Sequence, residues 1–134
     1  MKQIFADTFY WVALINKKDN WHQRVIEVTS TLKNVEIVTT DEVLIEVLNF
    51  LSAIVPLRRS AVQLVDDIMQ NPHIKVISQN RESFLEGFNL YRRRLDKEYS
   101  LTDCISMTVM QNLKINEVLT HDNHFKQESL IILF

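Results

Sequence analysis

Short apolar runs alternate with longer amphipathic segments along the whole chain, which predicts strands separated by helices. The runs that predict strands are short, and they cover residues 2–6, 35–38, 74–77, 117–120 and 130–133. The segments with helical spacing cover residues 8–15, 21–32, 42–53, 57–69, 79–95 and 100–113, and a short turn covers 123–126. Short strands alternating with helices are typical of an α/β fold, in which a parallel sheet carries helices on both faces.

The stretch from Ile4 to Leu14 combines both patterns around one carboxylate. An apolar run ends at Ala6, Asp7 follows, and apolar residues resume without Gly or Pro. This order predicts a buried strand that turns directly into a helix. Burial of an unpaired carboxylate is costly. Asp7 therefore either caps the helix or marks a crevice at the carboxyl end of the strand, where α/β sheets bind ligands.

Two of the predicted helices have apolar patterns that indicate how they pack. The helix at residues 42–53 carries a stripe that we expect to face the core. The stripe consists of Val43, Val47, Phe50, Leu51 and Ile54. Pro56 is expected to mark a break before the next helix. In the helix at residues 100–113, apolar residues surround most of the circumference, which indicates a central position.

Size and composition limit the class of protein. At 134 residues, with 46% apolar and 24% charged residues, the chain predicts one globular domain over residues 1–134. No apolar run approaches the ~18 residues that cross a bilayer, and the N-terminus lacks the pattern of a signal peptide. The single cysteine, Cys104, excludes an internal disulfide and suits a reducing compartment. We therefore expect a cytoplasmic protein without a membrane partner.

Charge and glycine content exclude two kinds of nucleotide or nucleic-acid binder. A net charge of −2 argues against a protein that coats nucleic acid electrostatically. It is compatible with an enzyme that holds nucleic acid at a metal site, because such a site is itself acidic. The only glycine is Gly87, which excludes the glycine-rich phosphate loops of dinucleotide-binding and P-loop proteins.

Carboxylates stand where this architecture would gather them at one edge of the sheet. Asp7 follows the first strand, and Asp122 follows the fourth. Asp103 lies in the first turn of the central helix, and Glu46 borders the apolar stripe at residues 43–54. Each has an ordinary explanation when taken singly. Asp7 and Asp122 suit helix caps, Asp103 suits a capping box with the serine three residues before it, and Glu46 suits a solvated helix flank.

Taken together, the carboxylates indicate a metal site. Two carboxylates ~4 Å apart repel by roughly 4 kcal/mol at an effective dielectric constant of about 20. A fold that gathers several of them therefore needs a cation. Oxygen ligands of this kind favour Mg²⁺ or Mn²⁺. Such an ion lowers the pKa of a water ligand and holds a phosphate for in-line attack, so the pattern indicates phosphodiester hydrolysis.

Four motifs, in order along essentially the whole chain, resemble those of PIN-domain ribonucleases, and most of all the small VapC-like toxins of type II toxin–antitoxin systems. The motifs are Phe5-Ala6-Asp7-Thr8, Val43-Leu44-Ile45-Glu46-Val47-Leu48-Asn49, Ser100-Leu101-Thr102-Asp103 and Leu119-Thr120-His121-Asp122-Asn123-His124-Phe125. The resemblance implies about five parallel strands in the order 3-2-1-4-5, with helices on both faces. It also implies a Mg²⁺-dependent (or Mn²⁺-dependent) endoribonuclease that cleaves RNA, pairs as a homodimer and is inhibited by a cognate antitoxin.

The same resemblance assigns roles by position in the motifs. The residues that would act as catalytic groups and as metal ligands are Asp7, Glu46, Asp103 and Asp122. Thr8 would help to orient Asp7, and Ser100 or Thr102 would support Asp103 through hydrogen bonds. The chain departs from the family pattern in lacking the glycine that often precedes the last strand.

Several side chains near these motifs have both an ordinary and a functional interpretation. His121 and His124 flank Asp122. We expect both to be loop residues that contact substrate and do not bind the metal. Arg92 and Arg93 lie at the end of a predicted helix, where they complement the helix dipole or grip RNA phosphates. A similar choice, between packing and the stacking of bases, applies to Tyr10, Trp11 and Trp21.

Three alternative functions bear on this prediction. A phosphoacceptor signalling domain needs an aspartate at the end of the third strand, but residues 76–80 contain no acid. A non-catalytic PIN-like binding module typically lacks one or more of the acids, and none is missing here. An RNA-processing nuclease that has no antitoxin remains open as an alternative.

Overall fold

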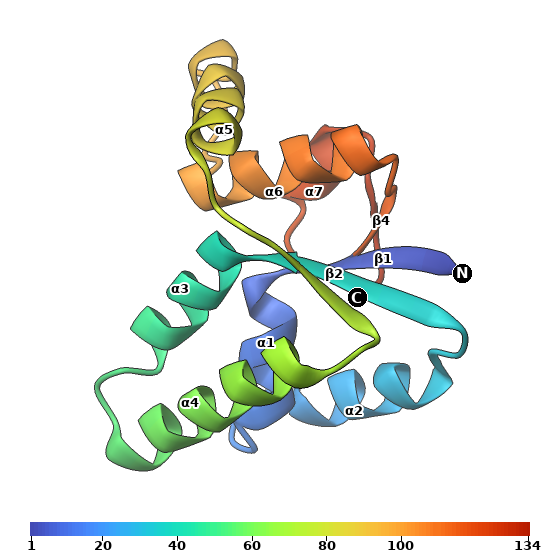
Figure 1. The fold of residues 1–134 in the computed structure, drawn as a ribbon, viewed down its shortest axis with the longest axis vertical. Helices are drawn as coiled ribbons and strands as arrows, with labels where there is room; N and C mark the ends of the chain where they lie inside the picture. Colours follow the sequence, from blue (N-terminus) through green and yellow to red (C-terminus); the bar gives the residue numbers. More distant parts are fainter.

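Five parallel strands run through the middle of the molecule and carry helices on both faces (Figure 1). The computed structural model describes all residues from 1 to 134. The strands are β1 Lys2–Ala6, β2 Val35–Thr40, β3 Ile74–Ile77, β4 Glu117–Leu119 and β5 Ile131–Ile132. The helices are α1 Thr8–Ile15, α2 His22–Thr31, α3 Asp41–Phe50, α4 Val55–Gln70, α5 Arg81–Arg93, α6 Leu101–Leu113 and α7 His124–Gln127.

The sheet order is β3-β2-β1-β4-β5, which confirms the predicted fold class and strand order. Every pair of neighbouring strands is parallel. At the carboxyl end of β1, Phe5 and Ala6 pair with Val118 and Leu119 of β4. The chain segments that follow β1 and β4 therefore lie side by side at one edge of the sheet, although they are far apart in sequence.

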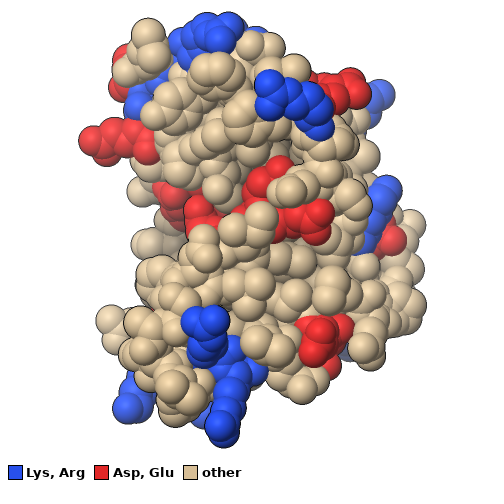
Figure 2. Space-filling model, turned by 60° about the vertical axis from the view of Figure 1, so that its left-hand side comes forward, with Lys and Arg blue, Asp and Glu red and all other residues tan.

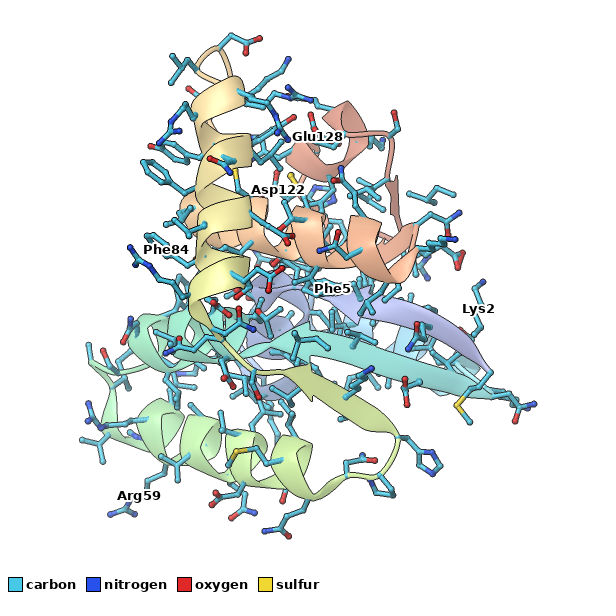
Figure 3. All side chains as sticks on the ribbon, turned by 45° about the horizontal axis from the view of Figure 1, so that its top comes forward. Lys2, Phe5, Arg59, Phe84, Asp122 and Glu128 are labelled. Carbon is cyan, nitrogen blue, oxygen red and sulfur yellow. The ribbon has the colours of Figure 1, made fainter.

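The helices divide between the two faces of the sheet. In Figure 1, α1, α2 and α4 lie below it, and α5, α6 and α7 lie above it. Helix α3 begins where β2 ends and contacts both α1 and α6. Phe5 of β1 is fully buried at the centre of the molecule (Figure 3), and α6 is buried without a break from Asp103 to Met110, as its apolar pattern predicts. None of the helices has the length and apolar character needed to cross a bilayer.

Helices α5 and α6 pack closely at the only glycine of the chain. A methyl group placed on Gly87 would overlap Cγ1 of Ile105 and lie 3.1 Å from the backbone nitrogen and Cα of that residue. Gly87 has no positive φ angle, so space and not backbone conformation explains the glycine. This close contact with α5 holds α6 in place at Ile105, which is two residues after Asp103.

The boundary between α3 and α4 differs from the prediction. Helix α3 ends at Phe50 instead of residue 53, because the chain turns at Leu51. Phe50, the last residue of α3, and Ile54, beyond its end, are 69% and 58% exposed and do not belong to the core. Pro56 lies in the first turn of α4 instead of ahead of it, where a proline is tolerated because the N–H that it lacks would have no helical partner.

Candidate functional site

One cavity of about 470 Å³ opens at the carboxyl edge of the sheet, and all four carboxylates singled out in the sequence line it. They are Asp7, Glu46, Asp103 and Asp122. Asp19, from the turn before α2, adds an acid that the sequence pattern did not indicate. Figure 2 shows acidic side chains gathered across the middle of this face, with basic side chains above and below them. The structure thus brings the predicted acids together.

The Asp7 side chain is only 5% exposed, and only one of its oxygens is satisfied. Its Oδ2 accepts a hydrogen bond of 3.1 Å from the hydroxyl of Thr120, whereas Oδ1 is buried without any partner. Asp7 occupies the N-cap position of α1 but makes no capping hydrogen bond with its side chain. Burial, and next the charge of Asp103, raise the pKa of Asp7 from 3.8 to about 7. A neighbouring cation would relieve both effects.

Asp103 forms the capping box that the sequence indicates. Its backbone N–H donates to Ser100 Oγ at 3.0 Å, and its Oδ2 accepts from the Ser100 N–H at 3.2 Å. Burial and the nearby charge of Asp122 raise the pKa of Asp103. The ordinary explanation is therefore correct, and it is compatible with a functional one because the capping box engages only one of the two carboxylate oxygens.

His124 connects two of the acids. Its Nδ1 lies 3.4 Å from Oδ2 of Asp103 and 3.3 Å from Oδ1 of Asp122, and its backbone N–H donates to Asp122 Oδ1 at 2.9 Å. Ligand atoms of Asp103, Asp122 and His124 all lie within 4.8 Å of one another. The sequence predicts His124 only as a loop residue that contacts substrate. The spacing Asp122-Asn123-His124 could have indicated its contact with Asp122, but local spacing does not indicate its contact with Asp103.

Hydroxyl groups support the acids, but not all of those that the resemblance implies. Thr120 donates to Asp7 and accepts from the backbone N–H of Asp122 at 3.1 Å. It was missed, although a threonine two residues before an acid is a recognisable turn pattern. The hydroxyl of Thr8 is buried without a partner, so it makes no hydrogen bond with Asp7, although a hydrogen bond from the Thr8 backbone opposes the rise in the pKa of Asp7. Of Ser100 and Thr102, only Ser100 makes hydrogen bonds with the Asp103 carboxylate and backbone, and Thr102 lines a separate cavity.

The arginines at the end of α5 differ in their contacts. Arg94 donates two hydrogen bonds, of 3.0 and 3.1 Å, to Glu128, which also accepts one from Tyr99 (Figure 3). Burial alone would raise the pKa of Glu128, but the bonds from Arg94 and Tyr99 outweigh it and lower that pKa. Arg92 lies over the ring of Phe88, 4.7 Å from its centroid. Arg92 and Arg93 are exposed in the last turn of α5.

The donor set of the cavity suits a divalent cation. Its lining includes the acids and no lysine or arginine, so no permanently charged cationic side chain of the lining balances the acids. The buried Oδ1 of Asp7 has no protein partner, which is unusual because buried polar atoms are nearly always hydrogen-bonded. Carboxylate oxygens of this kind bind hard cations such as Mg²⁺ and Mn²⁺.

A parallel sheet in the order 3-2-1-4-5 with acids converging at its carboxyl edge places the protein in a known family. The model of the PIN domain family matches residues 4–128. The chain therefore belongs to the PIN domain family.

Solved structures with the same fold include toxins of the VapC type. VapC20 of Mycobacterium tuberculosis, a toxin that cleaves the sarcin–ricin loop, matches with a TM-score of 0.87 and 24% identity over 96% of each chain. FitAcB of Neisseria gonorrhoeae matches with a TM-score of 0.69 and 14% identity over 98% of this chain and 96% of that one. VapBC2 of Rickettsia felis, bound to a DNA fragment from its promoter, matches with a TM-score of 0.68 and 16% identity over 97% of this chain and 96% of that one. No curated protein sequence matches the chain.

Proposed function

We propose that this protein is a metal-dependent endoribonuclease that hydrolyses RNA phosphodiester bonds as the toxin of a toxin–antitoxin pair. The observation that carries the proposal is the convergence of carboxylates from α3, α6 and the segments after β1 and β4 on one cavity that no lysine or arginine lines. Membership of the PIN domain family and the likeness to VapC20, a toxin that cleaves the sarcin–ricin loop, support it.

The residues that would hold Mg²⁺, or Mn²⁺ in its place, are Asp7, Glu46, Asp103 and Asp122. When bound, such an ion supplies positive charge opposite the phosphate and lowers the pKa of a water molecule. The unpaired buried oxygen of Asp7 supports this assignment, as does the raised pKa of Asp103, because both are features of acids gathered to share a cation.

The protein fixes one oxygen on each of three acids and leaves the other without a protein hydrogen bond. Thr120 holds Oδ2 of Asp7, Ser100 holds Oδ2 of Asp103, and the His124 backbone holds Oδ1 of Asp122. The ring of His124 lies against the last two of these oxygens. Side chains locked in this way are oriented before a ligand arrives, which is what supporting hydrogen bonds contribute around metal sites.

We further propose that the protein pairs with a second copy and with an antitoxin in the cytoplasm. Exposed apolar side chains on α5 and around the start of α4 are available for such contacts. They include Phe84, Leu85, Phe88, Tyr91, Ile54 and Val55. The single buried thiol of Cys104 is compatible with a reducing compartment.

The direct test is RNA cleavage by the purified protein with Mg²⁺. Asp103→Asn should reduce the cleavage rate at least about 100-fold, since it removes a charged ligand but keeps an acceptor for the Ser100 N–H. Asp66→Asn, at an exposed acid of α4, is the matched control and should keep full activity. Undiminished cleavage by Asp103→Asn would contradict the proposal, and growth arrest on expression would separate a toxin from an RNA-processing nuclease.

A further inference from the structure

Aromatic rings from four parts of the chain pack together beside the acidic cavity. Trp21, in the turn before α2, lies against the ring of His121 with centroids 4.2 Å apart and planes inclined at 38°. Phe9 of α1 meets Trp21 edge-on at 5.6 Å, and Phe134 meets Phe9 edge-on at 5.5 Å. The outermost side chain of this stack, His121, is held from behind by rings that are themselves half-buried.

The stack reaches the mouth of the cavity. Phe9 and His121 line the same cavity as Asp7 and Asp122, and His121 immediately precedes Asp122 in the chain. His121 is exposed to solvent. Packing of the chain terminus alone would not require an exposed imidazole at the rim of an acidic cavity, so the position of His121 needs another explanation.

A further aromatic side chain lines the cavity from α3. Phe50 is 69% exposed, and it lies one helical turn beyond Glu46, which lines the cavity too. Exposure of an aromatic ring to water is unfavourable. A solvent-exposed phenyl ring and a supported imidazole at one acidic cavity are suited to a ligand that combines a flat apolar surface with negative charge.

We propose that His121, backed by Trp21, and Phe50 bind an unpaired nucleobase of the RNA, so that the phosphate next to that base reaches the acids. This inference rests on the proposed nuclease function and deepens it. Side-chain rings stack on the faces of bases that have left a duplex, since paired and stacked bases cover those faces. A base bound in this way must be unpaired, so these residues would not engage a continuous duplex.

Binding of labelled oligoribonucleotides tests this proposal, and it should be measured with Asp103→Asn, which prevents cleavage. In that background, His121→Ala should weaken binding of an unpaired oligonucleotide roughly 5-fold to 100-fold, which is the range for loss of one stacking surface. His121→Phe, which keeps a flat ring, should restore binding. His73→Ala, at an exposed histidine before β3, is the matched control and should bind as the parent does.

Two further measurements separate this proposal from the nuclease assignment. Calorimetric titration of Mg²⁺ should give the same affinity for His121→Ala and the unsubstituted protein, since the stack is not among the metal ligands. A duplex of the same composition should bind more weakly than the single strand. Equal binding of duplex and single strand would overturn the stacking site, and so would an unchanged affinity of His121→Ala for the oligonucleotide. Neither result would affect the nuclease assignment if the unsubstituted protein cleaves RNA in a metal-dependent way. A changed oligomeric state in His121→Ala without a change in RNA affinity would also overturn it, since the surface would then join copies of the chain.

Discussion

The carboxyl group of Asp7 destabilises the metal-free fold when it is ionised. Its pKa lies at about 7 in the folded protein, above the ordinary value of 3.8. The folded state therefore holds this proton more tightly than the unfolded state does, and stability falls as the pH rises from about 4 to 7. Each unit of pKa corresponds to about 1.4 kcal/mol, so the total effect is on the order of a few kcal/mol.

Asp7→Asn should therefore stabilise the metal-free protein at pH 8, and the gain should shrink towards pH 4. The amide oxygen of asparagine can still accept the hydrogen bond from Thr120. Thermal unfolding in EDTA across this pH range measures the effect, with Asp66→Asn as a control for an exposed acid. A melting temperature for Asp7→Asn at pH 8 below that of the unsubstituted protein would show that Asp7 has a structural role that outweighs its charge.

His124 is expected to act through the acids that it contacts. Its ring lies within 3.4 Å of both Asp103 and Asp122, and loss of such a supporting group typically weakens metal binding about 10-fold to 100-fold. His124→Ala should show this loss in calorimetric titration with Mg²⁺ or Mn²⁺. His124→Asn, which keeps an N–H donor, should recover part of it, and His73→Ala should bind the ion normally. Equal affinity in all three variants would assign no role to the ring.

At the scale of helices, the contact between α5 and α6 leaves no room for a side chain at Gly87. Gly87→Ala gains helix propensity of up to about 1 kcal/mol, but the new methyl group would meet backbone atoms of Ile105 at 3.1 Å. Overpacking of this kind costs about 1–3 kcal/mol. We therefore expect a net loss of roughly 1–2 kcal/mol in the free energy of unfolding, measured with urea.

A second substitution on α5 separates the effect of overpacking at Gly87 from the effect of helix propensity. Asn89 is exposed on the same helix, so Asn89→Ala should be neutral or slightly stabilising. The loss at Gly87 should also be accompanied by weaker Mg²⁺ binding, because displacement of α6 moves Asp103. If Gly87→Ala is as stable as Asn89→Ala, the two helices can separate without cost.

The hydrophobic pattern predicts the type and burial of the helices and strands well, but it predicts poorly where a helix ends and the chain turns. The alternation of strands with helices and the central position of α6 agree with the prediction, because apolar periodicity reflects burial directly. The strand order also agrees, but it was implied by the resemblance to PIN-domain proteins and not by periodicity. Phe50 and Ile54 continue the spacing of a buried stripe, yet both are exposed, because Phe50 is the last residue of α3 and Ile54 lies beyond its end. The pattern contains no signal for that early end.

The candidate site shows a similar limit. Acids that follow parallel strands must meet at one edge of the sheet, so Asp7 and Asp122 could be placed from the sequence. The bond from Thr120 to Asp7 joins residues 113 positions apart. It depends on which strands are neighbours and on side-chain rotamers, and neither can be read from local spacing. The contact of His124 with Asp103 was missed for the same reason.

At the scale of the whole molecule, basic side chains lie on both sides of the acidic cavity, so an RNA strand that contacts both basic groups would pass over the acids. Figure 2 shows basic side chains above and below the acidic group, at the heights of α5 and α4. The chain has a net charge of −2, so attraction of RNA must come from local basic groups and bound cations. Exposed arginines at the end of α5 are candidates for phosphate contacts.

Replacement of Arg92 and Arg93 together by alanine should therefore weaken RNA binding and leave the cleavage rate at saturating RNA nearly unchanged. Each lost phosphate contact should also reduce the slope of log affinity against log salt by about 0.7 for a single strand. Lys33→Ala, at an exposed position just before β2, controls for the loss of one positive charge elsewhere and should have little effect. Equal salt dependence in both variants would assign Arg92 and Arg93 only to the helix dipole.

The distance in sequence between Asp7 and Asp122 has a consequence for synthesis of the protein. A nascent chain emerges in order, and its domains generally fold as units once the required residues are available. Strand β1 meets its neighbour β4 only after residue 119 has left the ribosome. The acidic cavity therefore cannot form while most of the chain is still being translated. If the protein is the nuclease proposed above, a nascent chain has no active site until its translation is nearly complete.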